Sequence, residues 1–280
     1  MTKTLLFVSM ISSFLCSAQD DLLKDIDTIS TTENSQPPAF KALQIVTGQS
    51  TKITAKKEWY VVIAHRFGDV STGFKNFFGL DDASTKLGVI YGLTDAISLS
   101  LSRETNMKTF EAGAKYRLLK QSENVPVDLV GYNVMAINTD LDTDNYPFLK
   151  FNNRLSYLTQ ALISRRFNDN FSLQLTPSYI HKNLYDPKIE DDNQFLTGLG
   201  GRYKISKRIS INAEYFVNYD SHSFYKNPFS LGMDIETGGH VFQLLFSNSQ
   251  LNSDIGYLTN ATGRWEKGQI FFGFNLYRVF

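Results

Sequence analysis

Most of the chain after residue 57 alternates between apolar and polar residues with a period of two. At 97–102, Ile, Leu and Leu alternate with serines, and similar runs recur at 171–176 and 209–218. Successive side chains of a β-strand point to opposite faces of the sheet, so these segments form strands with one apolar and one polar face. No long segment in this part of the chain shows the three- and four-residue spacing of an amphipathic helix. We therefore predict an all-β fold.

Twelve segments carry this strand signal, and the connections between them are sorted by length. The segments cover residues 57–66, 85–91, 96–103, 108–119, 126–137, 152–167, 171–182, 194–204, 208–219, 228–237, 240–248 and 269–280. Connections after even-numbered segments are short, and those after odd-numbered ones are longer except at Glu104–Met107. Up-and-down outer-membrane barrels have short periplasmic turns and long outer loops. We predict an antiparallel transmembrane β-barrel of about 10–12 strands.

The final segment is strongly apolar and closes the predicted barrel. Ile270, Phe272, Phe274 and Leu276 share one face of an extended strand, and Arg278 interrupts that face before Phe280. An even number of strands places both ends of the barrel on the side of the short turns. We expect Phe280 to be the closing-strand signal that the barrel-assembly machinery reads.

The amino-terminal part divides into two further segments. Residues 1–18 combine Lys3, an apolar stretch and the small-residue site Cys16-Ser17-Ala18, which is typical of a secretory signal peptide. Residues 19–56 are predicted to be a flexible periplasmic leader with a short strand or plug at 42–53, followed by a barrel domain at 57–280. Lipidation of Cys16 is the alternative to cleavage. If Cys16 is removed, the mature chain has no cysteine for a disulfide.

The charges are balanced, and many fall on the polar face of the predicted strands. Equal numbers of basic and acidic side chains, 28 of each, argue against a nucleic-acid partner. A buried charge needs a partner, so we predict a polar network in the lumen. Its members are Glu111, Lys115, Arg117, Arg202, Lys204, Glu214, Asp234 and Glu236. Alternatively, these charges face water on a soluble sheet.

Several blocks of the chain, from 57 to 280, resemble a known family. The blocks include His-Arg-Phe-Gly at 65–68, Gly-Leu-Asp-Asp-Ala-Ser-Thr at 79–85 and Asp-Ile-Glu-Thr-Gly-Gly-His at 234–240. They are similar to an uncharacterised outer-membrane β-barrel family of Bacteroidota-type bacteria, known as a domain of unknown function. The motif positions are His65, Arg66, Gly68, Asp81, Asp82, Gly238, Gly239 and His240. The resemblance implies an outer-membrane barrel and brings no catalytic residue or cofactor.

Three motifs resemble catalytic or metal-binding patterns, but each is better explained without a catalytic or metal-binding role. Ser221 and His222 lie in a predicted outer loop, but adjacent Ser and His seldom reach each other with an orienting third group. Asp140, Asp142 and Asp144 alternate like the start of a calcium loop, whose glycine and closing glutamate are replaced by Asn145 and Phe151. His65 and His240 fall on strands that are not adjacent in a meander, so each is expected to bond its local turn. We predict no catalytic, metal or cofactor residue.

Together these features predict a non-enzymatic barrel in the cell outer membrane, in contact with its lipid bilayer. Its role would be structural, a narrow channel for small solutes, or an interaction through the long loops. One alternative is an outer-membrane hydrolase that acts on lipid or glycan. The other is a soluble exported lipocalin-like binding barrel, which is also up-and-down.

Overall fold

The structure is a computed structural model that describes residues 37–141, 143–144, 147–220, 223–237 and 240–280. Residues 37–280 form one compact unit. Within the described residues, no helix is long and apolar enough to cross a membrane.

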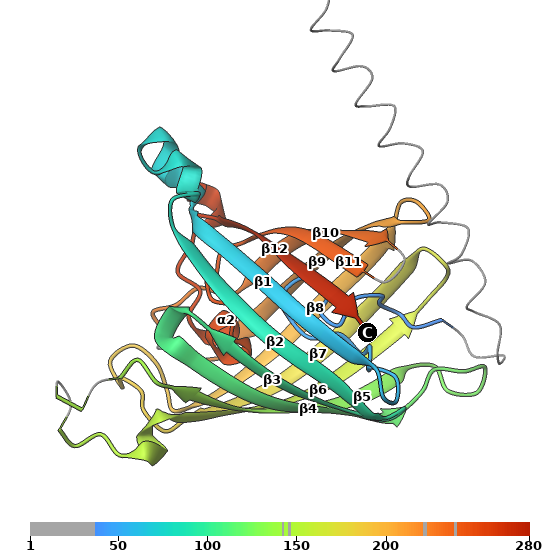
Figure 1. The fold of residues 1–280 in the computed structure, drawn as a ribbon, viewed down its shortest axis with the longest axis horizontal. Helices are drawn as coiled ribbons and strands as arrows, with labels where there is room; N and C mark the ends of the chain where they lie inside the picture. The colour runs from blue at the N-terminus through green and yellow to red at the C-terminus, as the bar shows by residue number, and fades with distance from the viewer. Residues whose placement is uncertain (1–36, 142, 145–146, 221–222, 238–239) are drawn as a thin grey trace, which may run out of the picture. The chain divides into compact units, whose positions relative to one another are not determined.

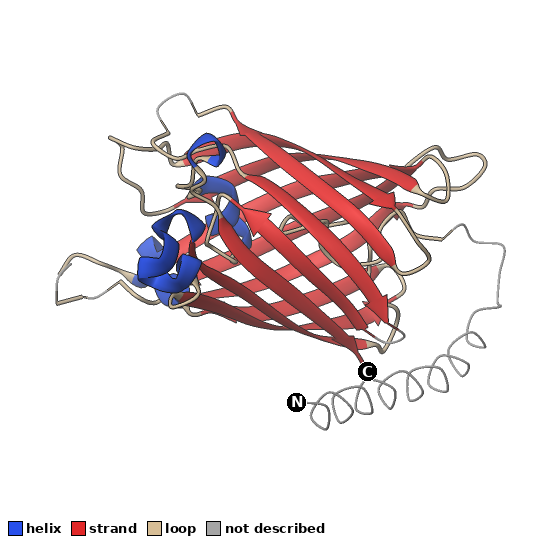
Figure 2. Cartoon of the chain, turned by 90° about the horizontal axis from the view of Figure 1, so that it is seen from above, coloured by secondary structure: helices blue, strands red, loops and turns tan. Residues whose placement is uncertain are grey.

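Twelve antiparallel strands form a closed barrel (Figures 1 and 2). They are β1 Trp59–Asp69, β2 Ala83–Thr94, β3 Ile97–Glu104, β4 Thr109–Leu119, β5 Asp128–Asn138, β6 Leu155–Arg166, β7 Phe171–Lys182, β8 Asn193–Lys204, β9 Ile209–Asn218, β10 Phe229–Thr237, β11 His240–Ser247 and β12 Phe271–Val279. Each strand pairs with its neighbours along the chain, and β12 pairs with β1. The predicted up-and-down barrel is therefore confirmed.

The seam of the barrel joins the first and last strands through their terminal residues. The N–H of Trp59 donates to the carbonyl of Phe280 at 3.2 Å, and the N–H of Phe280 donates to the carbonyl of Trp59 at 2.9 Å. The β1–β12 register runs from Tyr60 opposite Val279 to Arg66 opposite Gly273. Closure of the sheet removes the unpaired edges that an open sheet would expose.

The two faces of the barrel differ as the sequence alternation predicts. Large apolar side chains on the outer face are exposed, for example Leu101 at 62% and Phe195 at 60%. On the inner face, polar residues such as Gln174 and Glu214 are buried. The strands have 8 to 12 residues, and a tilted strand needs about 9–11 residues to cross a bilayer.

The helical elements gather at the end of the barrel that carries the long loops (Figure 1). We call this the long-loop end and the opposite one the short-turn end. The 3-10 helices are η1 Val70–Gly79, η2 Asn106–Lys108, η3 Phe151–Arg154 and η4 Trp265–Lys267. The α-helix α2, Asp254–Thr259, belongs to the connection between β11 and β12, and all six of its residues are buried.

Candidate functional site

Two segments occupy the inside of the barrel. The N-terminal plug, residues 39–54, precedes β1, and the loop plug, residues 249–261, connects β11 to β12. Nearly every residue of both segments is buried, with Lys41 the exposed one of the N-terminal plug. The side chains that bond these segments project inward from the strands, so the candidate site is the filled lumen.

The N-terminal plug forms a tight hairpin. Gln44 and Gln49 make an antiparallel bridge, and the N–H of Ile45 donates to the carbonyl of Gly48 at 2.8 Å. The N–H of Ser50 donates to the carbonyl of Leu43 at 3.0 Å. These bonds satisfy part of the backbone, and the tip of the hairpin must find its other partners on the barrel wall.

Glu214 of β9 supplies the main acceptor for that tip. Its carboxylate accepts hydrogen bonds from three consecutive backbone N–H groups, those of Val46 at 3.2 Å, Thr47 at 2.7 Å and Gly48 at 2.8 Å. Glu214 is 2% exposed. A buried carboxylate needs such donors because water cannot solvate it, and hydrogen bonds to a charged group are stronger than neutral ones.

Side chains from three further strands form hydrogen bonds with the rest of the N-terminal plug's backbone. The Nζ of Lys115 on β4 donates to the carbonyls of Leu43 at 2.8 Å and Ser50 at 2.9 Å. On β12, Asn275 donates to the carbonyl of Val46 at 2.9 Å. Gln243 on β11 donates to the carbonyl of Ile45 at 3.1 Å. Side chains of the barrel wall therefore replace the backbone partners that a regular strand would have.

Close packing accompanies these bonds. Gly200 of β8 lies against the plug, since a Cβ there would stand 2.5 Å from Cδ1 of Ile45. Phe40 and Val46 form a buried apolar cluster with Leu245 of β11. The plug is thus fixed by apolar burial as well as by polar contacts.

The loop plug is held at the amino end of α2 by two carboxylates. Glu104 accepts from the backbone N–H groups of Asn252 at 2.5 Å and Ser253 at 2.9 Å. Glu111 accepts from the N–H of Asp254 at 2.7 Å and also pairs with Lys86 at 2.6 Å. Free N–H groups at a helix start favour negative charge, so these glutamates stabilise the buried position of α2.

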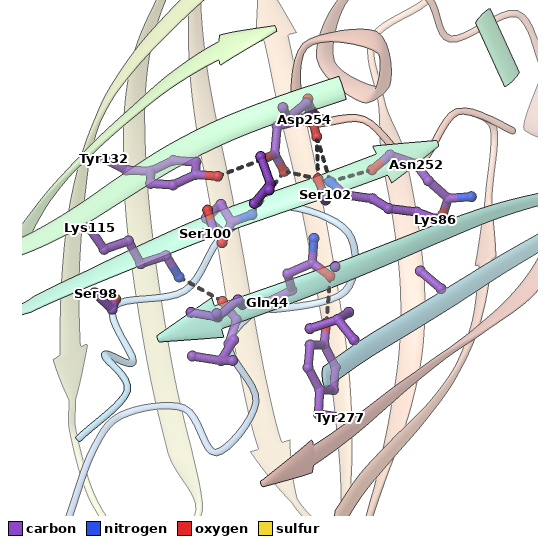
Figure 3. Close-up of a pocket in the computed structure, with 18 of the residues that line it drawn as sticks. Gln44, Lys86, Ser98, Ser100, Ser102, Lys115, Tyr132, Asn252, Asp254 and Tyr277 are labelled. Atoms are coloured by element: carbon purple, nitrogen blue, oxygen red, sulfur yellow. Dashed lines mark hydrogen bonds and ion pairs between the residues drawn. The ribbon is translucent and has the colours of Figure 1, made fainter. Parts of the chain in front are cut away.

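The two plugs contact each other in the middle of the lumen. Gln49 donates to a carboxylate oxygen of Asp254 at 2.8 Å, and Tyr132 of β5 donates to the other at 2.6 Å (Figure 3). The hydroxyl of Tyr257 donates to Glu214 at 2.8 Å. Glu214 therefore binds both plugs at once. Burial and the nearby Glu214 charge raise the pKa of Tyr257, so this hydroxyl keeps its proton at neutral pH.

Little free space remains between the plugs. The cavity lined by residues such as Gln44, Lys86, Ser100 and Tyr132 holds about 50 Å³ (Figure 3). A cavity needs about 10–15 Å³ of space open to the centre of a water molecule to hold one water. The central cavity thus has room for a few waters.

The predicted lumen residues lie on the inner wall but pair differently from one another. Arg202 pairs with Glu236 at 2.7 Å, and Asp234 accepts a hydrogen bond from Gln243 at 2.7 Å. Lys115 bonds the N-terminal plug instead of a carboxylate. Arg117 donates to the carbonyl of Asp95 at 3.3 Å, and Lys204 is half-buried near the short-turn end.

The motif positions are spread over both faces of the barrel. Arg66 is buried in the lumen and donates to Asn275 at 2.9 Å and to the hydroxyl of Thr47 at 3.2 Å. Near the long-loop end, the N–H of Gly68 donates to the carbonyl of Asp82 at 3.1 Å, and Asp81 is exposed.

The expectation that His65 bonds its local turn is wrong. β1 continues to Asp69, so His65 lies within the strand on the outer face, where its ring bonds the hydroxyl of Thr85 on β2 at 2.9 Å. His240 begins β11, and β12 separates β11 from β1. The two histidines therefore lie on strands that are not adjacent, as the meander predicted.

Some predicted motifs fall outside the described residues. These positions are 1–36, which include the proposed signal peptide, Asp142, Asn145, Ser221, His222, Gly238 and Gly239. In the part of the chain that is described, no group of three or more His, Cys, Asp or Glu could hold a metal ion. Asp140 forms a surface ion pair with Lys108 at 2.8 Å.

Sequence reasoning missed the residues that build the loop plug. Lys86 and Glu104 follow the inward parity of β2 and β3, and this parity was a usable signal. A second signal was the run Ile255-Gly-Tyr-Leu258 inside a connection interpreted as an outer loop. An apolar run in a loop needs a place to be buried, and here that place is the lumen.

Comparisons with known proteins agree with this architecture. The model of a family described as "Membrane bound beta barrel domain (DUF5777)" matches residues 40–280. A structure of the NanC porin in a rhombohedral crystal form is similar, with a TM-score of 0.50, 10% identity, and coverage of 79% of this chain and 98% of that one. A KdgM porin in complex with disordered oligogalacturonate has a TM-score of 0.52, 10% identity, and coverage of 79% and 99%. No curated protein matches the chain. At such identity the likeness establishes a shared barrel fold.

Proposed function

We propose that this chain, which belongs to the membrane bound beta barrel domain family (DUF5777), is a narrow outer-membrane channel closed by its own N-terminal plug. In this proposal the structure corresponds to the closed state, and withdrawal of residues 39–54 opens a path for small polar solutes. The observation that carries the proposal is that side chains of the barrel wall hold the plug backbone, while the plug takes part in none of the twelve barrel strands.

The chemistry of the lumen supports a path for polar solutes. The inner wall carries buried Gln, Asn, Ser, Lys and Glu side chains, whereas an apolar interior would repel water. A barrel with a purely structural role could fill its interior with apolar side chains. Polar groups that now bond the plug would bond water after the plug has left.

The energetics also suit a segment that can be displaced. Ordering the plug backbone costs conformational entropy. Burial of large apolar side chains, such as Phe40, Leu43 and Ile45, offsets that cost. The closed state is then a difference between large opposing terms, which a partner or a ligand that binds the plug can reverse.

Location and assembly complete the proposal. Residues 1–18 serve as the signal peptide, and the barrel-assembly machinery recognises the closing strand β12 together with Phe280, which follows it. Porins are among the solved structures that share this fold, and they support a channel over a lipid- or glycan-acting hydrolase.

The direct test is conductance in planar lipid bilayers. Purified full-length protein is compared with a variant that lacks residues 37–54, and heat-modifiable gel migration confirms that both barrels are folded. We expect no stable current from the full-length chain and discrete small openings from the variant. A folded variant that stays silent would refute the channel and favour a structural role.

A further inference from the structure

The long-loop end of the lumen opens into a second, much larger cavity. This outer vestibule has a volume of about 860 Å³ and lies over α2. Its lining includes Ile255 and Asn260 at α2, and also Arg154, Lys182, Leu184 and Tyr185. Ligand pockets in proteins commonly measure about 300–1,000 Å³.

The walls of the vestibule are mainly apolar although they face the outside. Leu184 is 45% exposed and Tyr185 is 39% exposed, and Ile189 and Ile255 line the same space. Apolar side chains that converge on a concave surface offer a place for the apolar part of a ligand.

The charges of the vestibule are unequally satisfied. Lys182 and Glu190 are both buried and form an ion pair at 2.6 Å, and Gln194 donates to the same Glu190 oxygen at 3.0 Å. Asp186 is exposed and caps its own turn by accepting from the N–H of Lys188 at 3.0 Å. Arg154, the last residue of η3, is half-buried, and its guanidinium has no hydrogen bond or ion pair within the described residues.

An unpaired guanidinium beside apolar walls defines the ligand chemistry. A carboxylate matches the planar fork of arginine with two parallel hydrogen bonds. From these positions we infer that the outer vestibule binds an amphipathic carboxylate, with its anionic group on Arg154 and its apolar body against Leu184, Tyr185 and Ile255. The site is formed with both plugs in place, so binding does not depend on the opening of the channel.

Saturation-transfer NMR on the full chain in lipid nanodiscs tests this inference, with empty nanodiscs as the background. The probes are hexanoate, hexan-1-ol, which lacks the charge, and acetate, which lacks the apolar body. We expect hexanoate to bind at least tenfold more tightly than either of the other two. Equal binding of hexanoate and hexan-1-ol, or no binding of hexanoate, would overturn the inference.

Two arginine variants locate the site. R154Q should weaken hexanoate binding at least tenfold. R208Q makes the same change in the short turn between β8 and β9, at the opposite end of the barrel, and should leave binding unchanged. Heat-modifiable migration checks that both variants fold. If R154Q binds like the wild type, or if R208Q loses binding equally, the vestibule assignment is wrong.

Discussion

The two segments that fill the lumen are attached to the barrel in different ways. The N-terminal plug is tied to a strand only at its carboxyl end, where it leads into β1. The loop plug is tied at both ends, to β11 and β12. Withdrawal of the first breaks no strand pairing, whereas the second can move only as a loop that swings about two fixed points.

They also differ in how their backbones are satisfied. The N-terminal hairpin depends on side chains from β4, β9, β11 and β12. The loop plug contains α2, where the N–H of Tyr257 bonds the carbonyl of Ser253 at 2.8 Å, so part of its backbone needs no wall contact. The comparison supports the proposal that the N-terminal plug is the segment that leaves the lumen and that the loop plug remains there as a constriction.

Among single substitutions, Glu214→Ala should destabilise the buried N-terminal plug the most. This change leaves three backbone donors of the plug and the Tyr257 hydroxyl without their acceptor. A buried unpaired donor costs about 1–3 kcal/mol, so the plugged state should lose roughly 3 kcal/mol or more. Amide hydrogen exchange at residues 45–48 should then accelerate at least about 100-fold, because 1.4 kcal/mol corresponds to a factor of ten. Unchanged exchange would show that Glu214 does not hold the plug.

Glu104→Ala is the matched change for the loop plug. It removes the acceptor of the Asn252 and Ser253 N–H groups, but the hydrogen bonds within α2 and both tethers remain. Exchange at residues 252–259 should rise at least about 30-fold, from the loss of about 2 kcal/mol or more. Exchange at residues 45–48 should stay close to wild type. If exchange at residues 45–48 also accelerates, the two plugs open as one cooperative unit, and they do not differ in how their backbones are held.

Gly200→Ala should have a smaller effect, through packing alone. The new Cβ would stand 2.5 Å from the flexible end of Ile45, which must shift. Overpacking of this kind costs about 1–3 kcal/mol, and an adaptable side chain favours the lower value. We expect about fivefold faster exchange at residues 45–48. Gly201→Ala is the control, because its Cβ would lie 3.0 Å from Leu173 and not against the plug. Equal effects of the two changes would exclude a specific contact with the plug.

Lys52→Met should give a distinct pH dependence. Burial, and then the nearby Lys41, lower the pKa of Lys52 from 10.5 to about 8, although Glu58 and Glu236 raise it. The released plug, with an ordinary lysine, binds more protons between these two pH values, so plugging should strengthen as pH rises from 8 to 10.5. At pH 7, Lys52→Met should hold the plug in the lumen more stably than the wild type does. In this variant the stability of the plugged state should not change between pH 8 and 10.5. Lys56→Met at an exposed position is the control. If the pH dependence of plugging persists in Lys52→Met, another titratable group causes it.

The barrel could be predicted from the sequence because its signals are local. Strand alternation depends on neighbouring residues, and the length of each connection is read directly, so predicted and observed strand ends such as 66 and Asp69 differ by no more than three residues. The inward parity of Glu111 and Glu214 was equally readable. Their partners were not, because those partners are backbone N–H groups of distant segments with no side-chain signature.

The filling of the lumen could be predicted only in part. The sequence predicted either a short strand or a plug at 42–53. No local feature of that segment shows that its turn contacts Glu214. The apolar run Ile255–Leu258 was a signal, but it was interpreted as part of an outer loop. Which loop folds inward is decided by the space that the closed barrel leaves, and that space exists only after all the strands are assembled.

Labelling of one plug residue tests the central claim most directly. Val46→Cys is made together with Cys16→Ser, and a small maleimide is added to the folded protein in nanodiscs. Lys120→Cys in the exposed turn after β4 sets the rate for a free thiol. Val46 is 0% exposed, so Val46→Cys should stay unlabelled while Lys120→Cys reacts fully, and adding Glu214→Ala should make it reactive. Labelling of Val46→Cys at the rate of Lys120→Cys, with Glu214 intact, would contradict the plugged channel.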